Sequence, residues 1–130
     1  MKLSEEEIGV VEGDAVAIKP ITIEPKVINF GGIVPGESKD QTFTVKNNSQ
    51  KEYNIRYNLL MDPTGEPVDD MIATYKAYVN GVEYRRASWL LLAPRSHHEV
   101  LIRLTLLSSC PIGNGVKVRC GVWTGKELIE

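Results

Sequence analysis

The stretch VINFGGIVPGESKDQTFTVKNNS, residues 27–49, decides the fold class of this chain. A short apolar run over residues 27–30 leads into glycines and a proline, and an alternating run over residues 41–46 ends in a polar turn. In the alternating run, Phe43 and Val45 share one face, and the threonines and lysine beside them share the other. One apolar face and one polar face are typical of a strand in an antiparallel sheet. We therefore expect two strands here, joined by a glycine-rich turn.

The same period of two recurs along the chain. It covers residues 53–61, 100–107 and 116–122, and turn-forming residues stand between these runs. The strongest turn signal is Asn80-Gly81, since a type I′ hairpin needs positive φ at both central residues and this pair tolerates it. These runs predict seven or eight short strands. The fold class that we expect is all-β, an immunoglobulin-like antiparallel β-sandwich.

One segment fits two structures. Residues 69–79 have an acidic start and apolar positions that would suit a short helix capped by Asp69 or Asp70. The Asn-Gly hairpin uses the end of the same segment. We expect a strand over residues 74–79, with at most a helical turn before it.

Length and composition indicate one ordinary globular domain. The chain has 130 residues, of which 42% are hydrophobic and 25% charged, and a formal net charge of -2 that would not attract nucleic acid. The sequence shows no secretory leader and no apolar run long enough to span a membrane. We expect a flexible start over residues 1–8 and a single domain over residues 9–130. We further expect a soluble protein, cytoplasmic by default, with no nucleic-acid partner and no membrane insertion.

A family resemblance supports the sandwich. Pro25, the pair Phe30-Gly31 and Gly36 precede the alternating strand, and residues 89–123 contain a strand that ends near a proline, a long alternating strand and a turn. This arrangement resembles the Hydin-type (ASH) immunoglobulin-like domains, which belong to the wider family of domains like major sperm protein. The resemblance implies a sandwich whose core is plugged at one end by Phe30.

The chain departs from the family pattern in three places. Arg95 follows Pro94 where the family usually has glycine, and residues 61–86 are longer than a minimal member needs. Residues 124–130 are short for a final strand. We therefore consider that the last strand could come from the N-terminal segment or from a partner.

Few residues suggest a metal site or a disulfide. His97 and His98 are adjacent and would point to opposite faces of a strand, so they cannot readily hold one metal ion. Cys110 and Cys120 could form a disulfide, but about 20 Å of strand would separate them, and we expect reduced thiols. A loop of oxygen ligands for calcium is a further alternative, although a solvated acidic loop is the simpler interpretation. The acidic residues of this loop are Asp62, Glu66, Asp69 and Asp70.

The sequence contains no nucleophile motif and no phosphate-binding loop, so we expect neither an enzyme nor a bound cofactor or metal. The leading hypothesis is a non-catalytic module that binds another protein, or a second copy of itself within a larger assembly. An open sheet edge over residues 115–123 would accept a strand from the partner. The candidate partner-binding residues are Trp123, Arg119 and Lys117, which alternation places on the outer face.

A second hypothesis is a carbohydrate-binding module on the same sandwich. Such a module needs two or three aromatic rings that lie coplanar on one exposed face. The candidates are Trp123, Tyr84 and Tyr78.

Overall fold

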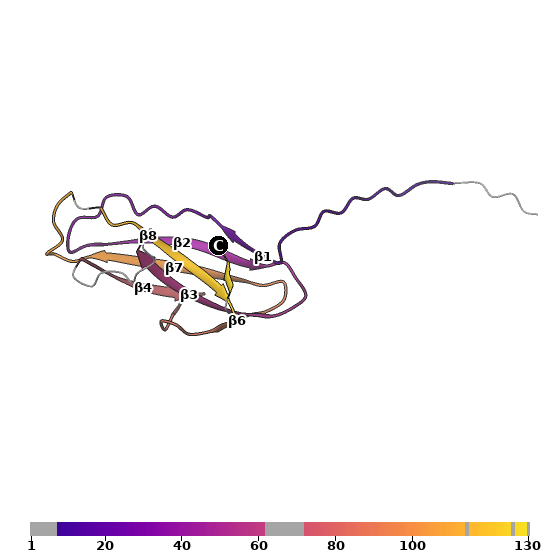
Figure 1. Ribbon diagram of the computed structural model, residues 1–130. Coiled ribbons are helices and arrows are strands. Elements are labelled where there is room, and N and C mark those ends of the chain that lie inside the picture. The colour runs from indigo at the N-terminus through magenta and orange to yellow at the C-terminus, as the bar shows by residue number, and fades with distance from the viewer. Residues whose placement is uncertain (1–7, 62–71, 114, 126, 130) are drawn as a thin grey trace, which may run out of the picture.

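The computed structural model describes residues 8–61, 72–113, 115–125 and 127–129, which form two antiparallel sheets packed face to face (Figure 1). The expected all-β sandwich is confirmed. Nine strands are present in the described residues, one more than the upper expectation, because the short elements β5, β6 and β9 all pair. The strands are β1 Ile21–Glu24, β2 Ser38–Asn47, β3 Tyr53–Met61, β4 Ala73–Val79, β5 Val82–Glu83, β6 Leu90–Leu92, β7 His97–Leu106, β8 Val118–Thr124 and β9 Glu127–Ile129.

The strands form one sheet of five and one sheet of four. The first sheet has the order β1-β2-β7-β4-β5, and the second has the order β6-β3-β8-β9. The alternating runs turn their apolar faces inward, as the periodicity predicts: Phe43, Val45, Tyr57 and Val100 are all buried. Such interdigitated inner faces form the core of a sandwich.

The Asn-Gly hairpin is confirmed. Asn80 has φ of 51° and Gly81 has φ of 80°, the positive values of a type I′ turn, and β4 pairs with β5 across it. The strand expected over residues 74–79 is also confirmed, because β4, Ala73–Val79, pairs with β7. The helix start proposed at Asp69 or Asp70 lies outside the described residues.

The expected strand over residues 27–30 was wrong. β1 ends at Glu24, and residues 25–35 cross the edge of the sandwich without strand structure. Pro25 contributes to this change because proline has no N–H to donate to the ladder. Phe30 is buried at 8% exposure, in agreement with its expected place at one end of the core.

The last strand comes from the end of this chain. β9 pairs with β8 through Val122↔Ile129, Trp123↔Leu128 and Thr124↔Glu127. Neither the N-terminal segment nor a partner supplies it. Residues 8–19 instead extend away from the sandwich in an exposed strand-like path, which is drawn in indigo in Figure 1.

A buried polar pair joins the two sheets. His98 of β7 is 5% exposed, and its Nδ1 accepts a hydrogen bond of 2.7 Å from the hydroxyl of Tyr57 on β3. Its Nε2 donates at 2.9 Å to the carbonyl of Leu91 on β6. Desolvation lowers the pKa of His98 and raises the pKa of Tyr57, so both side chains stay neutral.

The two cysteines lie apart in the fold. Cys110 is buried and Cys120 is half-buried on β8, and no disulfide joins them. Within the described ranges, no helix has the length and apolar character needed to cross a membrane.

Candidate functional site

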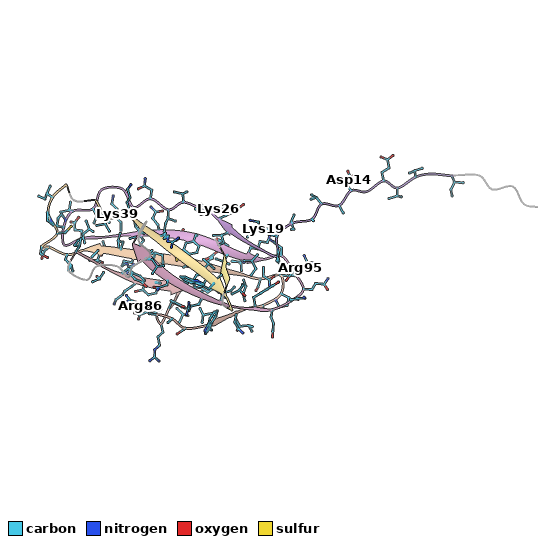
Figure 2. All side chains as sticks on the ribbon, in the orientation of Figure 1. Asp14, Lys19, Lys26, Lys39, Arg86 and Arg95 are labelled. Atoms are coloured by element: carbon cyan, nitrogen blue, oxygen red, sulfur yellow. The ribbon has the colours of Figure 1, made fainter. Side chains whose placement is uncertain are left out.

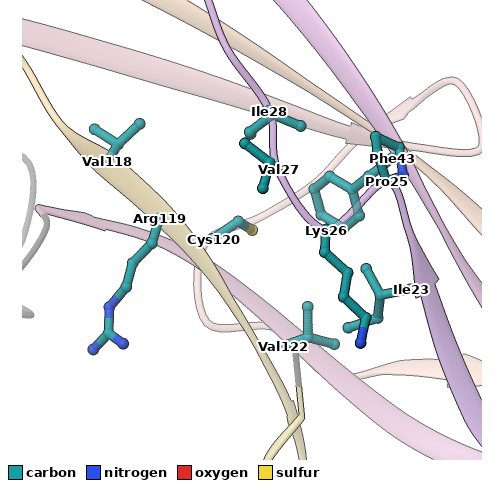
Figure 3. Close-up of a pocket in the computed structure, with 10 residues that line it drawn as sticks. All are labelled: Ile23, Pro25, Lys26, Val27, Ile28, Phe43, Val118, Arg119, Cys120 and Val122. Atoms are coloured by element: carbon teal, nitrogen blue, oxygen red, sulfur yellow. The ribbon is translucent and has the colours of Figure 1, made fainter.

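A groove runs along the side of the sandwich where β8 faces residues 25–33, and we call it the β8 groove (Figure 3). Its first part is a cavity of about 250 Å³ between residues 25–28 and the inward side chains of β8. Its second part, of about 680 Å³, continues between residues 27–33 and residues 115–118. The two parts share Val27, Ile28 and Val118, so they form one continuous groove.

The walls of the groove are mainly apolar. Val118, Cys120 and Val122 line it from β8, while Ile28 and Phe43 line it from the opposite side, as Figure 3 shows. Val27 is 79% exposed although it lines both parts, so a hydrophobic side chain faces water here. Removing apolar surface from water is favourable, so an apolar side chain that entered the groove would be bound favourably.

β8 offers backbone groups along the groove. β9 pairs only with Val122–Thr124, so the described residues contain no strand neighbour for Val118 and Arg119 on this side. The direction of the backbone follows from the opposite edge of β3, where the amide of Tyr57 donates to the hydroxyl of Tyr84 at 3.1 Å. The Tyr57 amide points away from β8, so Tyr57 and Val122 do not hydrogen-bond to each other across the ladder. The backbone N–H and C=O of Val122 therefore point away from β3. By alternation the N–H and C=O of Val118 also point away from β3, toward the groove.

The facing wall offers backbone groups as well. Residues 26–28 are outside any strand, and none of the hydrogen bonds recorded among the described residues uses their backbone. An extended segment that entered the groove could therefore pair with β8 and approach a second chain segment on its other side.

The other edge of the second sheet is closed. β6 pairs with β3 only over Tyr53–Ile55. Beyond that point, the hydroxyl of Tyr84 accepts from the amide of Tyr57, and the hydroxyl of Tyr75 accepts from the amide of Leu59 at 3.4 Å. These tyrosines satisfy the edge that β6 leaves uncovered, so the accessible edge of this sheet is the one beside the groove.

Of the three predicted partner-binding residues, two border the groove. Lys117 is exposed and lines the second part, and Arg119 is half-buried and lines the first part. The Arg119 side chain points away from the cavity toward the outer face of the sheet (Figure 3). Its Nε is buried without a hydrogen-bond partner among the described residues.

Trp123 does not border the groove. It is half-buried on the outer face of the second sheet, where the guanidinium carbon of Arg56 lies 5.0 Å from its ring centroid. The same Arg56 lies 5.3 Å from the centroid of Trp89. The expected outward direction of Trp123 is therefore correct, but its ring is engaged within the domain through a cation–π contact.

The three rings named for a carbohydrate platform lie apart. Trp123 is on the outer face of the second sheet, and Tyr78 is on the outer face of the first, where Arg103 stacks on it at 5.6 Å. Tyr84 packs edge-to-face on the buried Tyr57 and donates from its hydroxyl to Ser88. These three side chains cannot form one flat binding face.

The sequence offered two places for a metal ion, the His97-His98 pair and the acidic loop. His97 is exposed while His98 points into the core, so the pair diverges as expected. No three histidine, cysteine or carboxylate side chains gather within the part of the chain that the structure describes. The acidic loop considered for calcium lies outside it.

Comparisons with known proteins found no relative of this chain. No protein-family model matches the sequence, and neither the curated proteins nor the solved structures contain a match.

Proposed function

We propose that this chain is a protein-binding module, not an enzyme, and that the β8 groove is its binding site. The ligand is an extended polypeptide segment that adds to β8 as a further strand. The observation that carries the proposal is the coincidence of two features at one place: an uncovered length of β8 and an apolar groove beside it. Strand addition uses main-chain hydrogen bonds for affinity and side-chain pockets for specificity.

The groove favours a ligand with alternating side chains. A strand paired with β8 would turn every second side chain inward, toward Val118, Cys120 and Ile28. These positions favour valine, isoleucine or leucine in the ligand. Lys26 and Lys117 line the groove, so acidic residues beside the apolar ones would add favourable electrostatics.

The immunoglobulin-like resemblance is compatible with this function. Such sandwiches carry many unrelated functions, so the resemblance supports the scaffold and the groove supports the function. No observation favours the carbohydrate-binding alternative, because Trp123, Tyr84 and Tyr78 do not share one face. Calorimetric titration with a panel of polysaccharides should therefore show no binding.

Selection from a library of displayed random peptides tests the proposal. We expect the selected peptides to have apolar residues at every second position and to lose binding to a Val27→Asp variant. Val82→Asp is the matched control, because Val82 is 70% exposed on β5, far from the groove in the strand order. Peptides that bind both variants equally would show that the ligand docks elsewhere.

A further inference from the structure

We infer that the occupant of the β8 groove is the N-terminal segment of a second copy of this chain, residues 8–19. The inference rests on the proposed function and names its partner. The chain would then assemble head to tail, with the segment of one copy added to β8 of the next.

The N-terminal segment has the pattern that the groove favours. Val16 and Ile18 alternate with Ala15 and Ala17, so an extended conformation places both large side chains on one face. Val16 is 84% exposed and Ile18 is 66% exposed, and Ile8 and Val10 farther along are also exposed. These exposed β-branched residues suit a strand and leave apolar surface that pairing with a sheet edge would bury.

The length of the segment is sufficient. Twelve residues span at most about 40 Å when extended, and residues 115–119, which line the groove into the start of β8, need roughly 17 Å of strand. Residues 14–19 alone can therefore line the groove, and the rest can follow the second part of it.

The base of the segment is fixed in a direction that leads away from its own groove. The side-chain amide of Asn48 donates to the carbonyl of Lys19 at 3.3 Å, and its backbone amide donates to the carbonyl of Pro20 at 2.7 Å. Figure 1 shows the segment leaving at the start of β1 and continuing outward, whereas Ile23 and Pro25 at the far end of β1 line the groove. Reaching its own groove would require a reversal at Lys19, and a residue before proline is restricted to extended conformations.

The N-terminal segment and the groove carry opposite charges. Glu12 and Asp14 lie in the segment, and Lys26 and Lys117 line the groove. Figure 2 shows Asp14 on the extended segment, well separated from Lys26 on the same molecule. Opposite charges on two separate surfaces of one chain favour contact between copies.

The expected assembly is open. The segment and the groove are different surfaces, so their contact is heterologous. The assembly therefore keeps an unused groove at one end and an unused segment at the other. Growth continues until the ends close or the concentration limits it.

Size-exclusion chromatography with light scattering on the full chain tests the inference. We expect the wild-type mass to rise with concentration, up to the highest concentration that stays in solution. Val16→Asp/Ile18→Asp should be monomeric, and so should Val27→Asp. Mixing these two variants should give a one-to-one complex, because one retains the groove and the other the segment. Ala15→Asp/Ala17→Asp is the matched control: the same charges face outward from the added strand, so association should persist.

Two results would overturn the inference. The first is a wild-type monomer at every concentration, with fast hydrogen exchange at the amide of Val118. That result would remove self-docking and leave the groove open for another peptide. The second is a wild-type monomer whose Val118 amide is protected in the wild type but exposed in Val16→Asp/Ile18→Asp. In that case the segment would fill the groove of its own chain. Slow exchange at Val118 in the Val16→Asp/Ile18→Asp monomer would contradict the proposed function as well, because the edge would already be closed.

Discussion

The ring of Trp123 lies over Gly121, two residues earlier on the same face of β8, so closely that a Cβ at position 121 would be 2.3 Å from its Cη2 atom. The ring fills the space that a side chain would need, and the guanidinium carbon of Arg56 lies 5.0 Å from the ring centroid. This arrangement explains why an outward tryptophan is only partly accessible.

Gly121→Ala should destabilise the domain by about 1–3 kcal/mol, because the new methyl group displaces the tryptophan ring. Chemical denaturation measures the change in the free energy of unfolding. In a Trp123→Ala background the same substitution should cost much less, since the clash is gone. Equal costs in the two backgrounds would mean that the ring does not occupy this place.

His98 should make stability depend on pH. Burial holds its pKa below 6.5 in the folded state, so below pH 6.5 the unfolded chain binds a proton that the folded chain does not. The free energy of unfolding should therefore fall as pH decreases from 6.5 through the folded pKa, by about 1.4 kcal/mol for each unit of depression. Denaturation at several pH values measures the slope. His98→Gln should flatten it, whereas His97→Gln should reduce it only slightly, because His97 lowers the His98 pKa less than burial does.

Asn47 should be among the most sensitive polar positions. Its side chain is fully buried, donates to the carbonyl of Lys51 at 2.6 Å and to that of Ala93 at 3.1 Å, and accepts from the amide of Ser49 at 2.9 Å. Asn47→Ala leaves these groups without partners and should cost about 3 kcal/mol in chemical denaturation. Asn54→Ala, at an exposed site on β3, should change stability by less than about 0.5 kcal/mol. Similar effects at both sites would contradict the role given to Asn47.

Periodicity predicted much of the fold, but the burial of two polar side chains was not predicted. His98 shares the parity of Val100 and Ile102, and Asn47 shares that of Phe43 and Val45. Both side chains accordingly point into the core. This burial was not expected, because the sequence gives no sign of the Leu91 carbonyl and the Tyr57 hydroxyl that pair with His98.

The strand prediction over residues 27–30 failed for a different reason. An apolar run of four residues fits a strand and also fits a crossing segment that buries alternate side chains, and the ladder partner that decides between them is distant in sequence.

The candidate site was only partly predictable. We expected an open edge over residues 115–123, but β9 pairs with Val122–Thr124, so this expectation was wrong for Val122 and Trp123. Lys117 and Arg119 border the groove. Its facing wall, residues 25–28, lies about ninety positions earlier in the sequence, so no local pattern could reveal it. The position of the Trp123 ring depends on the missing side chain at Gly121 and the stacking of Arg56, which alternation alone does not show.

Hydrogen exchange of the β8 amides in the monomeric Val16→Asp/Ile18→Asp variant tests the central claim most directly. The account predicts alternating protection: slow exchange at Arg119 and Gly121, whose amides face β3, and fast exchange at Val118, whose amide faces the groove. In the wild type at high concentration, the Val118 amide should become protected as a strand adds. Slow exchange at Val118 in the monomeric variant would contradict the account, because β8 would then have no edge to offer a partner.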